Sequence, residues 1–301
     1  MSVINYNMVE SFDAIDIRAG TEEDTHAIIQ FASMLNEDPF ISKEKWYKTL
    51  ETPTTFPVIA VNKNKIIGKI QATIIDTIGW LEPATVSPEF RKLGLSHSLV
   101  KSAMDWLIEN GAKSVRTTID SDNLIGRKIV ERHNFIPNFL SINPSTKIST
   151  NDNLPEFTND FAKVLDETMY PHFKSMLKLT SYNIMIDGHW VPFTQPLFNQ
   201  LIDNNQIYTN IDQSTLIIIS KHALPSEIHG FISSNTIENY SSASLALKGY
   251  ASRDLATIAV AHSSSHREAM LGFAKQNFGW GQPHTVIMYS CLLYTSDAAD
   301  E

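Results

Sequence analysis

The sequence of residues 86–99 is Val86-Ser-Pro-Glu-Phe-Arg91-Lys-Leu-Gly94-Leu-Ser96-His-Ser-Leu99. A strand-like apolar run ends at Val86, and an amphipathic run to Asn110 follows. A basic, glycine-bearing loop therefore joins the end of a strand to the start of a helix. The first N–H groups of a helix are unpaired and its dipole favours anions there, while glycine lets the backbone approach closely. The stretch predicts a phosphate-binding loop.

Composition limits the classes of protein that this chain can be. Its 301 residues suffice for two domains of ordinary size, and 43% hydrophobic with 19% charged residues is typical of a soluble globular protein. The net charge of −9 argues against a nucleic-acid binder. We expect no membrane span, because no apolar run approaches ~20 residues. A single cysteine and an N-terminus without basic residues or an apolar segment predict a cytoplasmic protein.

Apolar periodicity predicts an α/β first half with the order β-α-α-β-β-β-α-β-α-β. The strand–helix–strand unit around the loop is expected to be parallel, and the hairpin before it makes the sheet mixed but mainly antiparallel. The predicted strands are 15–18, 56–61, 66–75, 78–86, 114–120 and 135–142, and the predicted helices are 21–35, 42–50, 95–110 and 124–132.

The second half partly repeats this pattern. Residues 215–220 and 228–233 resemble the hairpin strands, with Gly230 in the place of Gly68, and residues 256–260 resemble the strand that ends at Val86. A helix is expected at 265–278 and a strand at 284–290. The loop that would correspond to 86–97 is then 260–267, which has no phosphate-binding glycine pattern. We therefore expect one phosphate site in the chain.

The loop resembles the acetyl-CoA signature of the GNAT-type N-acetyltransferases, (Arg/Gln)-x-x-Gly-x-(Gly/Ala). Here the signature is Arg91-Lys-Leu-Gly94-Leu-Ser96, preceded by a matching Val86-Ser-Pro-Glu-Phe-Arg91. Downstream, Asp122-Asn123 and Phe135 are similar to a second segment of the family. The resemblance covers residues 14–142 well and 180–290 weakly. It implies a GNAT-like fold and, for the second half, a degenerate copy of it.

The resemblance also implies where acetyl-CoA binds as co-substrate. The pyrophosphate is expected on the N–H groups of Lys92, Leu93, Gly94, Leu95, Ser96 and His97, with charge-assisted contacts from Arg91 or Lys92. The pantetheine arm is expected between strands 80–86 and 114–120. The backbone N–H near Val86 would stabilise the oxyanion of the tetrahedral intermediate. Asn123 is expected either to contact the pantetheine or simply to cap a helix.

Two residues decide the catalytic prediction. Glu82 is the candidate base that takes a proton from the acceptor amine, since strand periodicity places it on one face with Trp80 and Ala84. The competing interpretation is a surface glutamate. The resemblance expects a proton-donating tyrosine at position 130, where this chain has Val130. The two alternatives expected are protonation of the leaving thiolate by solvent and weak catalysis.

The predicted organisation has four parts. Residues 1–142 form the acetyltransferase domain, 143–155 a linker rich in Pro, Ser, Thr and Asn, and 156–290 a degenerate, truncated second domain. Residues 291–301 resemble the translation of a sequencing adapter, the alternative being a genuine polar tail. His262 and His266 are four residues apart but have no further ligands nearby in the sequence, so no metal site is expected.

The predicted function is acetyl transfer from acetyl-CoA to a primary amine by direct attack in a ternary complex. The acceptor would be a small molecule or a peptide amine. The alternative is a non-catalytic acyl-CoA-binding or regulatory module, which Val130 favours.

Overall fold

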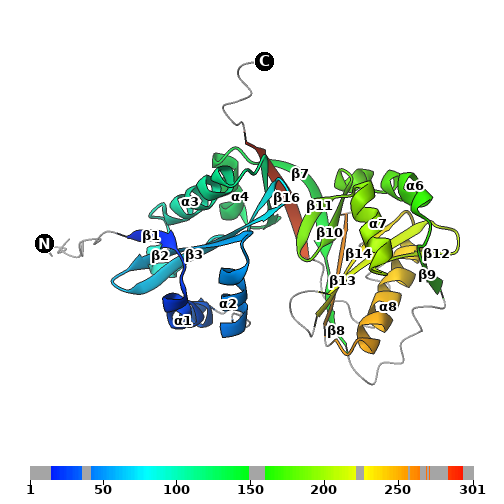
Figure 1. Ribbon diagram of the computed structural model, residues 1–301, viewed down its shortest axis with the longest axis horizontal. Helices are drawn as coiled ribbons and strands as arrows, with labels where there is room; N and C mark the ends of the chain where they lie inside the picture. Colours follow the sequence, from blue (N-terminus) through cyan, green and yellow to red (C-terminus); the bar gives the residue numbers. More distant parts are fainter. Residues whose placement is uncertain are drawn as a thin grey trace, which may run out of the picture. The chain divides into compact units, whose positions relative to one another are not determined.

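The computed structural model describes residues 15–35, 42–148, 160–221, 227–256, 258–264, 269, 271 and 284–293. The chain forms two compact units. The first unit comprises Met1–Ile119, Leu124–Ile136 and Tyr289–Glu301, and the second comprises Asp120–Asn123 and Pro137–Met288. Figure 1 shows the elements of each unit.

The first unit is built on a mixed sheet with the predicted strand order. Each of the first four strands pairs antiparallel with its neighbour, and β6 then pairs parallel with β4. A short strand, β5, pairs with β3 alone. The strands are β1 (Asp16–Ala19), β2 (Thr55–Asn62), β3 (Lys65–Ile75), β4 (Ile78–Leu81), β5 (Thr85–Val86) and β6 (Ser114–Asp120).

Helices cover both faces of this sheet (Figure 1). On one face α1 (Thr25–Leu35), which follows η1 (Glu22–Asp24), and α2 (Lys43–Glu51) pack into a core of Ile28, Phe31, Trp46, Ile59 and Ile66. On the other face lie α3 (Leu95–Glu109) and α4 (Leu124–Arg132), each confirming a predicted helix. Short 3-10 turn η2 (Pro88–Phe90) precedes α3.

The strands of the second unit pair in the order β9, β12, β13, β14, β15, and β8 pairs antiparallel with β15. Its strands are β7 (Ile136–Asn143), β8 (Ser145–Lys147), β9 (Phe161–Lys163), β12 (Ile207–Asn210), β13 (Thr215–Lys221), β14 (Glu227–Ser234) and β15 (Ile258–Ser264). Its helices are α6 (Tyr170–Ser175), α7 (Gln195–Asp203) and α8 (Ile237–Arg253), with η3 (Glu167–Met169) and η4 (Lys178–Thr180). A separate hairpin joins β10 (Asn183–Ile186) to β11 (His189–Pro192) through an Asp187-Gly188 turn.

The predicted equivalence between the two halves is wrong by one strand. β14 and β15 pair parallel and are joined by α8, so they correspond to β4 and β6 joined by α3. The prediction from the sequence matches β14 to β3 and places no helix in 237–253. Gly230 therefore corresponds to Gly79 and not to Gly68. An added Cβ at Gly79 would lie 2.8 Å from Leu107 of α3, and one at Gly230 would lie 2.6 Å from Leu247 of α8.

Two predicted boundaries also differ. The predicted linker begins as β8, because Ser145, Thr146 and Lys147 pair with β15 although their composition favours a turn. The last strand, β16 (His284–Leu292), runs through Cys291 and Leu292, beyond the predicted end at 290. Residues 294–301 and most of the predicted helix 265–278 lie outside the described residues. None of the described helices combines the length and the apolar character needed to cross a lipid bilayer.

Candidate active site

The strand predicted at 78–86 is interrupted where the site begins. Ala72 of β3 faces Leu81, whereas Lys69 faces Thr85, so three steps along β3 oppose four steps along the other strand. One extra residue in 82–84 therefore forms a bulge, which divides the predicted strand into β4 and β5. The parallel ladder between β4 and β6 ends just before this bulge, at the pair of Trp80 and Arg116.

Backbone polar groups on both sides of the bulge point away from β3. Leu81 directs its carbonyl to β6, where the buried Thr117 hydroxyl donates to it at 2.8 Å. Farther along, the Ser87 N–H donates to the Ile67 carbonyl at 2.9 Å. Alternation in an antiparallel ladder then turns the N–H of the preceding residue, Val86, away from β3. The predicted oxyanion donor thus points to the side where β4 and β6 have separated.

The loop 87–94 ends in a left-handed glycine. Gly94 is the N-cap of α3 with φ +82°, and no atom lies within 4 Å of where its Cβ would be. The glycine is therefore required by its backbone conformation and not by crowding. It brings no side chain to cap the helix. Among described residues, the first α3 amide that donates to a backbone carbonyl is that of His97, to Gly94 at 2.9 Å. The amides of Leu95 and Ser96 precede this ladder and suit an anion.

Three further residues of this loop are exposed. Lys92, with φ +67°, and Leu93 both lie on the surface, as does Arg91. The Arg91 Nε donates to the Val86 carbonyl at 3.1 Å, which ties the two ends of the predicted signature together. Leu95 is buried under the sheet, so only its backbone faces outward. This arrangement places Val86, Arg91 and the loop amides next to one another.

His97 differs from the prediction, because its N–H is used within α3. Its imidazole instead meets the end of α4. The His97 Nδ1 lies 3.1 Å from the His133 Nε2, and the Arg132 Nη1 lies 3.4 Å from the His97 Nε2. Since guanidinium is only a donor, His97 accepts at Nε2 and donates from Nδ1 to His133. Burial, with a smaller contribution from His97, lowers the pKa of His133.

Two further predicted positions lie around α4. Asn123 precedes this helix, its N–H donates to the Asp120 carbonyl at 3.0 Å, and it belongs to the second unit, so its pantetheine contact stays a prediction. Val130 is buried in the core. A tyrosine hydroxyl does reach α4, but from β16: that of Tyr289 donates to Glu131 at 3.1 Å and accepts from Arg127 at 3.2 Å. Sequence patterns could not find Tyr289, which lies far along the chain.

Glu82 lines a cavity under the helices of the other face. Gly79 faces α3, so alternation directs Glu82 away from α3. Its N–H donates to the Gln71 carbonyl at 3.0 Å, and its carboxylate accepts from the Gln71 side chain at 3.2 Å. The cavity holds about 90 Å³ and lies among α1, α2, β2 and β3. Its lining residues include Lys45, Trp46, Thr49, Lys69, Gln71 and Glu82.

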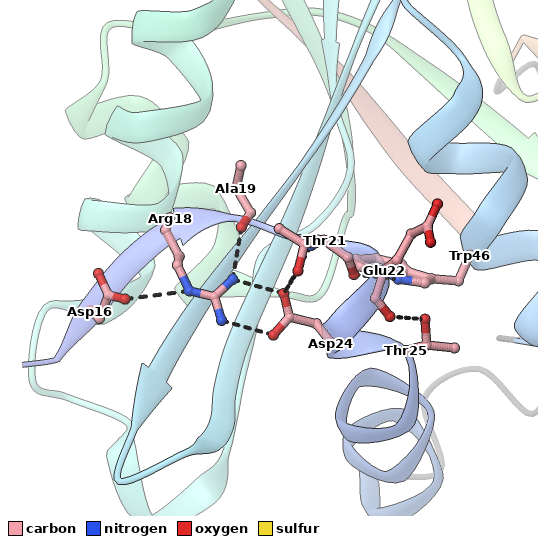
Figure 2. A network of polar contacts seen from close by, with 8 residues as sticks. All are labelled: Asp16, Arg18, Ala19, Thr21, Glu22, Asp24, Thr25 and Trp46. Carbon is pink, nitrogen blue, oxygen red and sulfur yellow. Dashed lines mark hydrogen bonds and ion pairs between the residues drawn. The ribbon is translucent and has the colours of Figure 1, made fainter.

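The wall of this cavity is fixed by the network in Figure 2. The Trp46 indole N–H donates to the Thr21 carbonyl at 3.1 Å. Asp24 in turn accepts from the Thr21 N–H and hydroxyl, both at 2.9 Å, and from two Arg18 nitrogens at 2.7 and 2.8 Å. Gly20 leaves room for the indole, since an added Cβ would lie 2.6 Å from it. The start of α1 therefore positions Trp46 of α2.

This network has an electrostatic consequence. The Arg18 guanidinium, with help from Thr21, lowers the pKa of the Asp24 carboxyl to about 2. The Asp24 side chain is only 10% exposed, so its charge is paired in a mostly buried place. Bidentate pairs of this kind are geometrically specific. The sequence alone predicts residues 21–24 only as a helix start.

The second unit ends its equivalent strand differently. Only Asn235 and Thr236 separate β14 from α8, and the Thr236 hydroxyl accepts from the Asn239 N–H at 3.2 Å. The prediction that residues 260–267 correspond to the loop 86–97 is therefore wrong. His262 of that segment lies in β15, where it contacts His229 at 2.9 Å and Asn143 at 3.2 Å. His266 lies outside the described residues. Within the described chain, no three His, Cys, Asp or Glu residues gather as metal ligands would.

Comparison with known proteins agrees with this geometry. A model of the acetyltransferase (GNAT) family matches residues 23–135, which include the loop, α3, β6 and α4. No curated protein matches the sequence.

Solved structures match over both units. A GCN5-related N-acetyltransferase from Sphaerobacter thermophilus shares 12% identity, with 93% of this chain and 96% of that chain covered and a TM-score of 0.58. A tandem GNAT protein from the clavulanic acid biosynthesis pathway shares 9% identity, with 94% and 100% covered and a TM-score of 0.55. These likenesses concern the fold, which is that of a tandem GNAT protein of about 300 residues. The family assignment applies to residues 23–135, which match the acetyltransferase (GNAT) family.

Proposed function

We propose that the first unit transfers an acetyl group from acetyl-CoA to a primary amine. The observation that carries this proposal is the uncapped start of α3 at Gly94, placed beside the bulge that frees the Val86 N–H. A diphosphate fits the exposed amides and cations of 91–96. The thioester carbonyl then lies within reach of the Val86 N–H, which would stabilise the oxyanion.

The chemistry balances with the residues present. The amine nitrogen attacks the thioester carbonyl carbon, a C–N bond forms and the C–S bond breaks. Glu82 takes the proton of the amine directly or through a water molecule. The thiolate of CoA leaves and takes a proton from solvent, because a thiol pKa of about 8.5 makes it a tolerable leaving group.

A second candidate is a module that binds acyl-CoA without turnover. It is favoured by Val130, which replaces the tyrosine that the family resemblance expects on α4. One assay separates the candidates: acetyl-CoA and a panel of amines are added, and free thiol is followed. Thiol release with an amine supports the enzyme, whereas CoA binding with no release from any amine supports the binding module.

Glu82→Gln sharpens this assay. We expect kcat to fall 10²–10⁴-fold with little change in acetyl-CoA affinity, as for removal of a general base. Glu89→Gln is the matched control, since Glu89 is an exposed glutamate of η2 that does not line the cavity beside Glu82. An unchanged kcat for Glu82→Gln would contradict its role as the base.

A further inference from the structure

The cavity beside Glu82 has walls of two kinds. Ile28 of α1, Trp46 of α2 and Ile59 of β2 contribute apolar groups. Other lining residues, including Gln71 of β3, contribute charged and amide groups. Because α1 and α2 cover this face of the sheet (Figure 1), a molecule that reaches Glu82 here lies against both kinds of wall.

Both signs of charge line this one small space. Lys45 of α2 and Lys69 of β3 are cationic and half-buried, and Glu82, whose side chain is more exposed, is anionic. Charges near one another in a partly desolvated site interact more strongly than in water. A ligand with one ammonium and one carboxylate can satisfy both signs. A diamine or polyamine would instead bring a second cation to the lysines, which disfavours it.

Size restricts the ligand further. The cavity volume of about 90 Å³ is smaller than the 150 Å³ cavity that admits a benzene ring in another protein. The buried part of the acceptor is therefore short and aliphatic.

We infer that the acceptor is a small free amino acid. Its ammonium pairs with Glu82, its carboxylate with Lys45 and Lys69, and its short aliphatic part packs against Trp46. The inference rests on the proposed function, because it assigns the acceptor of that same site. It makes Lys45 and Lys69 specificity-determining residues.

The test compares matched amines at saturating acetyl-CoA. Glycine, alanine, β-alanine and 4-aminobutyrate are assayed by thiol release beside their primary amides and the diamines of equal chain length. We expect kcat/KM for the best amino acid to exceed that of its amide and of its diamine at least tenfold. An amide or a diamine that matches or exceeds its amino acid would overturn the inference.

Variants then locate the effect. Lys45→Gln and Lys69→Gln should each raise KM for the amino acid at least tenfold and leave KM for its amide unchanged, since only the carboxylate contact is lost. Lys48→Gln is the matched control, because Lys48 lies exposed on α2 and does not line the cavity. A loss shared equally by acid and amide would indicate a merely structural effect and would overturn the assignment.

Calorimetric titration of the amino acids into the protein–CoA complex separates the two proposals. Binding heat that disappears in Lys69→Gln, without thiol release, would retain the amino-acid site and reject the transferase. Thiol release from diamines alone would retain the transferase and reject the amino-acid site. No binding of any amino acid to a complex that holds CoA would also reject this site.

Discussion

The two units contain the same strand–helix–strand arrangement with opposite outcomes at the helix start. In each, a glycine of the first strand lies under a leucine of the crossover helix: Gly79 under Leu107 of α3, and Gly230 under Leu247 of α8. In the first unit eight residues, 87–94, separate strand and helix, and the helix begins at a glycine without a side-chain cap. In the second unit Thr236 caps α8 itself. The same scaffold thus either offers helix N–H groups to a ligand or satisfies them internally.

The strands differ in the same sense. The ladder between β13 and β14 keeps one register over all seven pairs, from Thr215 with Ser234 to Lys221 with Ile228. In the ladder that β3 forms with β4 and β5, one extra residue lies between β4 and β5. In the second unit β14 pairs with β13 on one side and with β15 on the other, whereas β5 after the bulge pairs with β3 alone among the described strands, which leaves the Val86 N–H for a ligand. Anion binding and oxyanion stabilisation are therefore both expected in the first unit alone.

The largest expected effect comes from Gly94→Pro. Proline has φ near −65° and no N–H, so it cannot adopt the +82° conformation or donate to a phosphate. We expect CoA affinity to fall more than 100-fold in calorimetry. Gly111→Pro is the matched control, since Gly111 also has a positive φ and open space but lies at the other end of α3. Unchanged affinity in Gly94→Pro would remove the assigned loop from the site.

Deletion of Pro83 would give the first unit a continuous ladder beside β3, like the ladder between β13 and β14 in the second unit. Removing the extra residue restores a continuous ladder, and the alternation then turns a different N–H toward the gap. We expect kcat to fall about 10²–10³-fold, the usual cost of losing an oxyanion donor. The measurement is thiol release at saturating substrates, with CoA affinity determined separately. A kcat within threefold of the parent value would contradict the role of the bulge.

Acid should weaken the first unit through Asp24. Its pKa is lowered in the folded state from 3.8 to about 2, so its stabilisation is complete above pH 4 and is lost as the pH falls from about 4 to about 2. We expect Asp24→Asn to cost about 1–2 kcal/mol of unfolding free energy at pH 7. At pH 2 the parent protein and the variant should differ little.

Asp16→Asn is the control, because Asp16 is exposed and lies 3.4 Å from Arg18. It should change the unfolding free energy by less than 0.5 kcal/mol, as is usual for surface pairs. An equal loss for both variants across the pH range would mean that Asp24 does not act through its charge.

The smallest effect is expected from Thr236→Ala. Loss of the cap should lower the unfolding free energy of the second unit by about 1 kcal/mol and leave CoA affinity unchanged. Thr236→Ser, which keeps the hydroxyl, should restore stability. A change in CoA affinity would mean that the start of α8 contributes to the site after all.

The sequence identified the loop because its signals are local. Pro88, Arg91 and Gly94 lie within seven residues, and strand and helix periodicity flank them. The helix α8 was missed because its inward face is formed by Ala243, Ser244 and Lys248 as well as Leu247, which leaves little apolar contrast. Without that helix, the strands of the second unit were matched one position out of step.

Features made by several elements could not be predicted. The bulge depends on register with β3, and only Pro83 interrupts the local strand pattern. The cavity joins Lys45 of α2 to Lys69 of β3, which are distant in sequence, so their common charge environment becomes visible only in the fold. Strand periodicity alone predicts Glu82 as the candidate base. Its position in that cavity depends on residues of both α2 and β3.

The stoichiometry of CoA binding tests the contrast between the units most directly. Isothermal titration of the full chain with CoA should give one site per chain, because α3 begins without a side-chain cap whereas its counterpart α8 is capped by Thr236. Two sites per chain, or one site that persists at full affinity in Gly94→Pro, would contradict the assignment of the phosphate site to the first unit alone.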